Sequence, residues 1–310
     1  SGNTHYFGNP RFIPWNEMDV VGRIYVAREG INAQLSVPAE NFSVFKAHLD
    51  SISFLENVRL NIAIEQDNLS FLKLKVKVRK KIVADGLEDN SFDVTNKGIH
   101  VGAEQFNELI EDPDTVLVDM RNHYESEIGH FKNAITPDVD TFRDSLDIIE
   151  KDLADHKKDK KLVMYCTGGI RCEKASAYYK HKGFEQVYQL EGGIIEYTRQ
   201  VEQKKLENKF RGKNFVFDHR RGERISDDII ANCHQCGAPC DDHVNCANEA
   251  CHLLFIQCKS CAEKMNNCCS DACKEVHELP YEEQKALRKG KVVSNKIFKK
   301  GRSEVLKFKK

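Results

Sequence analysis

The turn between Cys166 and Arg171 is the part of this sequence best suited to chemistry. It follows an apolar run at 161–165 and leads into a helix-like stretch that begins at Cys172. A cysteine at such a junction lies beside free backbone amides, and the helix dipole favours negative charge there. These surroundings, with the cation of Arg171, lower a thiol pKa by one or more units from about 8.5. The turn therefore predicts a reactive thiolate at Cys166, and the alternative is a core cysteine beside a glycine turn. The residues expected to stabilise the thiolate or a bound anion are Thr167, Gly168, Gly169, Ile170 and Arg171.

Three more residues are expected close to this turn. Cys172 is six positions after Cys166, which is near enough for a resolving thiol, although burial in the first helical turn is the simpler interpretation. Asp119 and Arg121 follow the end of another apolar run. In one interpretation they support the site, and in the other they form a structural pair that holds the loops.

The elements around the turn alternate between strand and helix. Strands are expected at 98–101, 116–119, 162–165 and 186–190, and helices near 103–110, 140–154 and 172–182. Short apolar strands that alternate with helices predict a parallel sheet covered on both faces. In open α/β sheets, sites form at the carboxyl ends of the strands, and Cys166 follows such an end.

The front of the chain, residues 1–85, has a different pattern. Strands are expected at 20–27, 29–37, 58–64 and 72–78, with a helix at 39–51. This order predicts a small α+β sandwich, and residues 82–98 are expected to be a linker. Cations alternate along the last strand and continue beyond it, so that one face either meets solvent or contacts RNA. These cations are Lys73, Lys75, Lys77, Arg79, Lys80 and Lys81.

The cysteines predict a second kind of chemistry. Ten of the twelve lie between Cys233 and Cys273, in pairs with short spacing that is typical of tetrahedral zinc sites. Two interleaved zinc sites in a module at 229–276 are expected, and the alternatives are a single zinc ion or an iron–sulfur cluster. A nearby histidine, His234, His243 or His252, could replace one cysteine. The eight expected ligands are Cys233, Cys236, Cys246, Cys251, Cys258, Cys261, Cys269 and Cys273.

Composition sets broad limits. The chain has 310 residues, 40% of them hydrophobic, and a formal net charge of −1, so it has no general bias towards nucleic acids or membranes. It lacks an 18-residue apolar run and a signal-peptide layout, which predicts a cytoplasmic protein without a membrane partner.

Residues 203–228 are expected to connect domains, and 277–310 to form a basic tail. Between 281 and 310 there are eleven Lys and Arg and three Glu, which suits either a solubilising tail or RNA binding. No pattern fixes the oligomeric state.

The second domain resembles a rhodanese domain over residues 93–202. The resemblance rests on the cysteine turn and on 118–121, Glu125, 128–135 and 190–194. In rhodaneses the loop cysteine carries a persulfide held by loop amides. Related phosphatases have one more residue between the cysteine and the arginine, whereas four residues separate Cys166 from Arg171 here. The shorter loop resembles the sulfur-transfer version and argues against a phosphatase.

Over about residues 10–275 the chain is similar to the oxygen-dependent tRNA uridine hydroxylase family. The similarity rests on Arg28–Asn32, Lys77–Val83 and Tyr165–Lys174, and it departs from the family before Asn9. It implies a ferredoxin- or acylphosphatase-like front domain, a rhodanese domain and a Cys-rich zinc module. It also implies an oxidoreductase that forms 5-hydroxyuridine at the wobble position of tRNA, with molecular oxygen as co-substrate and Cys166 as the catalytic residue.

Two routes are open to Cys166. As a persulfide it would accept sulfur from a donor and pass it on, which would make the protein a sulfurtransferase. As a thiolate it could add to C6 of uracil and make C5 nucleophilic towards an oxygen species. The second route fits a chain in which we find no flavin or nicotinamide motif and no 2-His-1-carboxylate iron set. Hydroxylation is the favoured prediction, and a non-catalytic zinc-containing RNA-binding protein is a third alternative.

Overall fold

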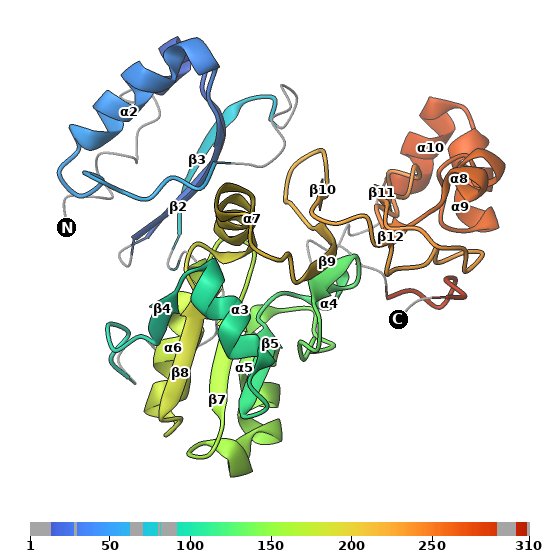
Figure 1. Cartoon of the computed structure of the whole chain (residues 1–310). Helices are drawn as coiled ribbons and strands as arrows, with labels where there is room; N and C mark the ends of the chain where they lie inside the picture. Colours follow the sequence, from blue (N-terminus) through green and yellow to red (C-terminus); the bar gives the residue numbers. More distant parts are fainter. Residues whose placement is uncertain are drawn as a thin grey trace. The chain divides into compact units, whose positions relative to one another are not determined.

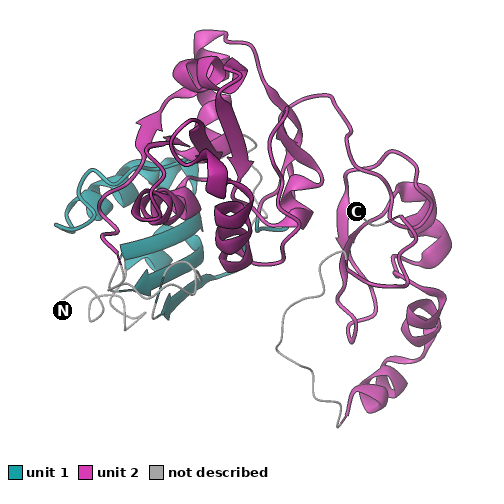
Figure 2. Ribbon diagram, turned by 90° about the horizontal axis from the view of Figure 1, so that it is seen from below, with its two compact units in different colours: residues 1–91, 217–220 teal, residues 92–216, 221–310 magenta. Residues whose placement is uncertain are grey.

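The structure is a computed structural model that describes residues 14–27, 30–62, 71–79, 81, 92–289 and 302–308. The chain divides into two compact units, which Figure 2 colours separately. The first unit comprises residues 1–91 with 217–220, and the second comprises 92–216 with 221–310. In the described residues no helix is long and apolar enough to cross a membrane.

The first unit is a sheet covered by a helix on one face. Its strands have the order β2-β1-β3, in which β2 is antiparallel and β3 parallel to β1. Helix α2 buries Phe45 and Leu49 against Trp15 and Ile24, because apolar side chains alternate along β1 and recur every three to four residues in the helix. The elements are η2 Pro14–Met18, β1 Val21–Ala27, β2 Gly30–Ser36, η3 Ala39–Asn41, α2 Phe42–Asp50 and β3 Leu74–Val78.

One expected strand of this unit is wrong in its described part. Residues 58–62 of the predicted strand 58–64 form no strand, and the remaining two positions lie outside the described residues. Val58 and Leu60 instead pack against the core as partly buried side chains of an irregular segment. Most of the expected linker 82–98, together with Arg28, Glu29 and Lys80, also lies outside the described residues.

The second unit contains the predicted parallel sheet, with strand order β4-β8-β7-β5. Helix α3 packs beside α7 on one face and α5 packs beside α6 on the other (Figure 1). Phe106, Phe131, Tyr165 and Tyr197 meet edge to face in the core between sheet and helices. The elements are β4 Ile99–Val101, α3 Ala103–Glu111, β5 Thr115–Asp119, α4 His123–Ser126, α5 Phe142–Asp152, η4 Ala154–His156, β7 Lys161–Tyr165, α6 Ile170–His181, β8 Gln186–Leu190 and α7 Gly193–Lys204.

The segment 203–228 is more ordered than a connector. It holds β9 Phe210–Asn214 and β10 Glu223–Arg224, which pair with β6 Gly129–Phe131 in a small sheet of order β10-β9-β6. Gly212 has φ 89°, and a Cβ there would overlap the carbonyl oxygen of Ile128. A glycine is therefore required where β9 approaches β6.

The Cys-rich part follows as short elements around two small cores. They are β11 His243–Asn245, β12 Leu254–Ile256, α8 Lys259–Met265, α9 Asp271–Glu278 and α10 Tyr281–Arg288. Two described parts of the expected basic tail are ordered. Helix α10 lies at the start of that tail, and Leu306 near its end is buried against Cys246, Cys268 and Cys269.

Candidate active site and cysteine clusters

Cys166 follows the last residue of β7, at the carboxyl edge of the parallel sheet. Its side chain is buried, and the Gly169 amide donates to its sulfur at 3.1 Å. The turn after β8 holds the loop in place, because Ile194 N–H donates to the Cys166 carbonyl at 3.0 Å and Ile195 N–H to that of Thr167 at 3.2 Å. A Cβ at Gly193, which has φ 66°, would overlap the same Cys166 carbonyl oxygen. The predicted loop is thus held against the N-terminus of α7.

The surroundings of Cys166 favour its thiolate. Burial by itself opposes ionisation, but it is outweighed by a hydrogen bond from Cys172, the charge of Arg171 and the backbone amides of these two residues. Together they lower the pKa of Cys166 to about 6. A thiol with that pKa is mostly ionised at neutral pH.

Cys172 supplies a proton donor to this thiolate. It lies in the first turn of α6 and is fully buried, as the simpler interpretation of the sequence expected. Burial and the neighbouring Cys166 raise its pKa well above the usual value, so it remains a neutral S–H group. The same side chain is thus both packed in the helix and directed to the reactive sulfur.

Arg171 is held in position by Glu125, a residue whose contact with the loop was not predicted from the sequence. Its guanidinium makes two hydrogen bonds of 2.8 Å to the fully buried carboxylate of Glu125, and the Thr167 hydroxyl donates to the same carboxylate at 3.4 Å. Burial opposes the charge of Glu125, but Arg171 outweighs it and the pKa of Glu125 is lowered. Glu125 also caps α4, since its side chain accepts from the backbone N–H of Asn122. The spacing Asn122-x-x-Glu125 is a capping-box pattern and was the available local signal.

Asp119 and Arg121 form the structural pair that the sequence left as one alternative. Both are fully buried, and Arg121 donates to Asp119 through Nε at 2.9 Å and through Nη2 at 2.6 Å. Nη2 also donates to the Gly129 carbonyl at 2.6 Å. The pair therefore joins the turn after β5 to the start of β6. Its two charges neutralise each other within the fold.

The comparisons with known proteins agree with this architecture. Family models match an acylphosphatase-like domain of UPF0176 proteins at residues 12–82, a rhodanese-like domain at 102–200 and a rhodanese C-terminal region at 211–274. A Leptospira interrogans protein named tRNA uridine(34) hydroxylase is 56% identical over 94% of this chain and 79% of its own length. Proteins of the same name from Photorhabdus laumondii and Yersinia pestis are 55% and 58% identical, over 96% and 92% of this chain and 84% and 81% of their own lengths.

The chain belongs to the tRNA uridine(34) hydroxylase family. The predicted acylphosphatase-like and rhodanese domains are confirmed.

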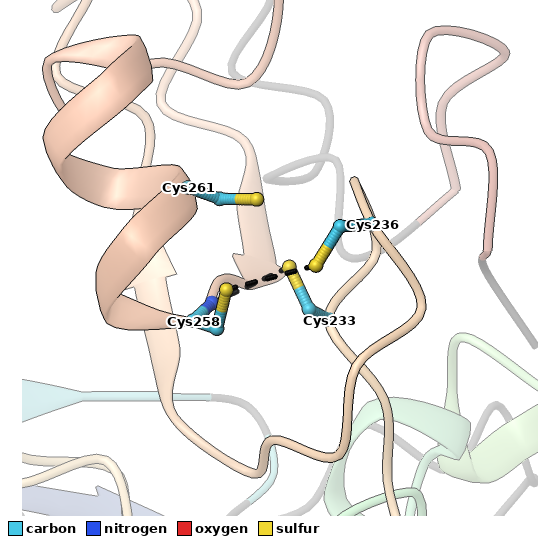
Figure 3. A group of neighbouring side chains, drawn as sticks. All are labelled: Cys233, Cys236, Cys258 and Cys261. Atoms are coloured by element: carbon cyan, nitrogen blue, oxygen red, sulfur yellow. Dashed lines mark hydrogen bonds between the residues drawn. The ribbon is translucent and has the colours of Figure 1, made fainter.

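This family member brings its eight expected ligand cysteines together in two groups of four. In the first group, Cys233 and Cys236 come from one loop, and Cys258 and Cys261 from the start of α8, with their sulfur atoms directed towards one another (Figure 3). The sulfurs lie within 4.8 Å of one another, and those of Cys236 and Cys258 are 3.7 Å apart. Sulfur atoms bound at 2.3 Å to a tetrahedral zinc ion are about 3.8 Å apart, whereas a disulfide is about 2.0 Å long. The spacing thus fits a shared ion.

The second group of four cysteines has the same spacing. It consists of Cys246, Cys251, Cys269 and Cys273, and Cys269 Sγ lies 3.7 Å from the sulfurs of both Cys251 and Cys273. Hydrogen bonds with Cys246 and Cys251 raise the pKa of Cys269, because four thiolates cannot crowd together without a cation. Cys240 and Cys268 stand outside both groups, as expected for the spare cysteines.

None of the three candidate histidines belongs to either group in the part of the chain that the structure describes. His234 instead links the first group to the active-site domain. Its Nε2 lies 2.8 Å from the Glu127 carboxylate, and both side chains are buried. Glu127 directly follows α4, the helix that presents Glu125 to Arg171.

The end of the tail makes a second link. Arg302 contacts Asp140 at 2.7 Å and Asp138 at 2.7 Å, both in the loop before α5. The Lys307 and Phe308 amides donate to the His234 carbonyl at 3.0 Å. Part of the basic tail therefore packs against the Cys-rich module.

Proposed function

We propose that this chain hydroxylates uridine 34 of tRNA and that the Cys166 thiolate is its catalytic group. Membership of the tRNA uridine(34) hydroxylase family supports the reaction. The observation that carries the role of Cys166 is its place at the sheet edge with a pKa of about 6 and a backbone amide on its sulfur. A thiolate prepared in this way is a nucleophile at neutral pH.

In the proposed mechanism the thiolate adds to C6 of the uracil ring. The electron pair of the C5–C6 double bond moves onto C5 and the O4 carbonyl, so that C5 becomes nucleophilic. An oxidant derived from O2 then transfers one oxygen atom to C5. Loss of the C5 proton and expulsion of Cys166 from C6 give 5-hydroxyuridine. With O2, the second oxygen atom leaves as water, and an external reductant supplies two electrons.

The other loop residues keep the nucleophile ready. Arg171 provides a positive charge that Glu125 holds in position. Cys172 donates a hydrogen bond to the sulfur when Cys166 is ionised. This hydrogen bond breaks as the C–S bond forms, and the proton stays on Cys172. In this proposal neither Asp119 nor Arg121 contacts the substrate, because their polar atoms are engaged within the fold.

We also propose that each cysteine group binds one zinc ion. The 3.7 Å sulfur spacings and the four-thiolate ligand sets support zinc. A closed four-thiolate zinc site supplies folding stability rather than catalysis. Metal analysis by mass spectrometry should find two zinc ions per chain, one of which is lost in Cys233→Ser and the other in Cys246→Ser. Iron with visible absorbance would contradict zinc.

The reaction is tested by nucleoside analysis of tRNA. Cells that lack the protein should lose 5-hydroxyuridine, the wild-type gene should restore it, and Cys166→Ser should not. Mass spectrometry of the purified protein with tRNA should detect a uridine adduct on the peptide that contains Cys166. Unchanged 5-hydroxyuridine in cells with Cys166→Ser would refute the role of Cys166. Sulfur-containing nucleosides that depend on Cys166 would indicate sulfur transfer instead. Action in the cytoplasm stays a prediction.

A further inference from the structure

The outward face of the sheet in the first unit gathers cations from two strands. Along β1, Ile24 and Val26 are buried in the core, so Arg23 and Tyr25 lie on the opposite face. The parallel register pairs Arg23 with Lys75 and Tyr25 with Lys77. Since paired residues share a face, these lysines lie beside Arg23 and Tyr25 on the surface away from α2.

The same alternation extends this face beyond both ends of β3. Lys73 and Arg79 occupy the two positions that continue the Lys75–Lys77 series, and all four side chains are exposed. On the other side of β1, Asn32 and Gln34 pair with Tyr25 and Arg23 and add amide groups to the face. The outward face therefore carries five cations, and residues 71–79 contain no acidic side chain. We call it the basic sheet face. Its members are Arg23, Tyr25, Asn32, Gln34, Phe71, Lys73, Lys75, Lys77 and Arg79.

These lysines differ from many lysines of the second unit. There, exposed or half-buried lysines pair with carboxylates, as Lys97 does with Glu173 at 2.6 Å and Lys161 with Asp112 at 2.6 Å. Within the residues that the structure describes, Lys73, Lys75 and Lys77 form no ion pair. Unpaired like charges on neighbouring positions repel each other, and a bound polyanion would remove that repulsion.

Two aromatic rings lie among the cations. The Arg23 guanidinium lies 5.9 Å from the centroid of Phe71, and that of Arg79 lies 5.5 Å from the centroid of Tyr25. Proteins that bind single-stranded nucleic acid combine such rings, on which bases stack, with cations that follow the backbone. Both rings are partly exposed. A surface that contacted only a lipid headgroup or a duplex would not need aromatic rings on which bases can stack. The combination favours unpaired RNA.

We propose that the basic sheet face binds the phosphate backbone and unpaired bases of a single-stranded RNA loop. That this RNA is the anticodon loop of tRNA rests on the proposed function, since uridine 34 lies in that loop. Lys73, Lys75 and Lys77 contact phosphates, and Tyr25 with Phe71 supports bases. The face thus supplies affinity for the RNA, and Cys166 supplies the chemistry.

The expected size of the effect follows from counterion release. Each phosphate contact to single-stranded nucleic acid contributes about 0.7 to the slope of log K against log salt concentration. Removing three contacts should reduce that slope by about 2 and weaken binding at 0.1 M salt by up to about 100-fold. Loss of one stacking ring should weaken binding roughly 5- to 150-fold without changing the slope.

The test uses the full chain and a synthetic anticodon stem-loop RNA. Binding is measured from 50 to 400 mM salt for the wild type, for Lys73→Gln/Lys75→Gln/Lys77→Gln and for Tyr25→Leu. A matched control removes three exposed lysines of the second unit, Lys151→Gln/Lys158→Gln/Lys204→Gln. The first variant should lose affinity and salt slope, Tyr25→Leu should lose affinity alone, and the control should keep the wild-type slope. Thermal unfolding confirms that each variant is folded.

Three results would overturn the proposal. Equal losses in the two triple variants would show a general charge effect, and equal affinity for a fully paired RNA of the same length would remove the single-strand preference. Binding to phosphatidylserine vesicles without binding to RNA would assign the face to a membrane surface. The proposed function is judged separately by 5-hydroxyuridine formation. If the triple lysine variant binds and modifies tRNA like the wild type while Cys166→Ser is inactive, only the face is refuted. If the wild type binds through this face but forms no 5-hydroxyuridine, only the reaction is refuted.

Discussion

Replacing Cys172 by alanine should raise the pKa of Cys166. Burial of Cys166 opposes its thiolate, and the hydrogen bond from Cys172 is the largest contribution that favours it. A hydrogen bond to a charged group is worth about 1.5–3 kcal/mol, which corresponds to a rise of about 1 to 2 in pKa. From about 6, the pKa of Cys166 would then approach 7 to 8 in Cys172→Ala.

Alkylation kinetics measure this change directly. Iodoacetamide reacts with the thiolate, and mass spectrometry of the peptide that contains Cys166 separates its reaction from that of the clustered cysteines. At pH 7 about nine-tenths of the wild-type Cys166 should be ionised, so the variant should react about two- to tenfold more slowly. Cys172→Ser is the matched control, because its hydroxyl still donates to the sulfur. An unchanged pKa in Cys172→Ala would refute the reasoning, and equal rises in both variants would assign the effect to packing.

The same pKa predicts how stability depends on pH. The pKa of Cys166 is depressed in the folded chain from 9.0 to about 6, which corresponds to about 4 kcal/mol. A depressed pKa contributes stability that is fully present above the unfolded value, near pH 9, and is lost as the pH falls towards 6. The free energy of unfolding of the wild type should therefore rise from pH 6 to pH 9 by up to about 4 kcal/mol more than that of Cys166→Ala.

Three further perturbations test the supports of the site. Glu125→Gln leaves the buried Arg171 cation without its counter-charge. It should lower the free energy of unfolding in denaturant by about 3 kcal/mol, and a decrease below about 1 kcal/mol would contradict a buried ion pair. Removing the proposed zinc with a chelator should lower the melting temperature and the rate of 5-hydroxyuridine formation. Added zinc should restore both. Full activity of the metal-free protein would contradict the link through His234. Leu306→Ala should destabilise the chain by about 2–3 kcal/mol, whereas Lys307→Gln should have no effect on urea unfolding; equal stabilities would show that the end of the tail is not packed.

Local patterns were enough to predict the main sheet and the reactive loop. The four parallel strands are short apolar runs, so their periodicity predicted the sheet. Cys166 follows one of these runs and precedes a glycine turn, which predicted the place of the reactive loop. Cysteine spacing likewise predicted the eight cysteines that form the two groups, because each close pair lies on one short loop or helix start. These features depend on residues that are neighbours in the chain.

The features that sequence did not predict depend on distant partners. Strand β6 has only three residues, which is too few for a recognisable alternation of apolar side chains. It pairs with β9, which lies about 80 positions later in the chain. Glu125 and Arg171 are 46 positions apart, and the capping pattern at Asn122 explains only half of the role of Glu125. In the tail, the lysine-rich composition gave no sign that Leu306 is buried, because its burial depends on the distant core around the second cysteine group. In 58–62, apolar residues contribute to the core without the backbone pairing that the pattern predicted.

The Cys-rich module is connected to the reactive loop through a short series of contacts. A thiolate with a depressed pKa needs a fixed cation, and Arg171 is fixed only as well as the short helix α4 that carries Glu125. A four-residue helix has little stability of its own. Glu127 joins the end of that helix to His234, which lies between two ligands of the first cysteine group. A zinc ion bound by this group would therefore restrain the end of α4 through His234 and Glu127. On this argument the proposed zinc ion would affect Cys166 through the position of the Glu125 carboxylate, and its removal should raise the pKa of Cys166 before the domain unfolds.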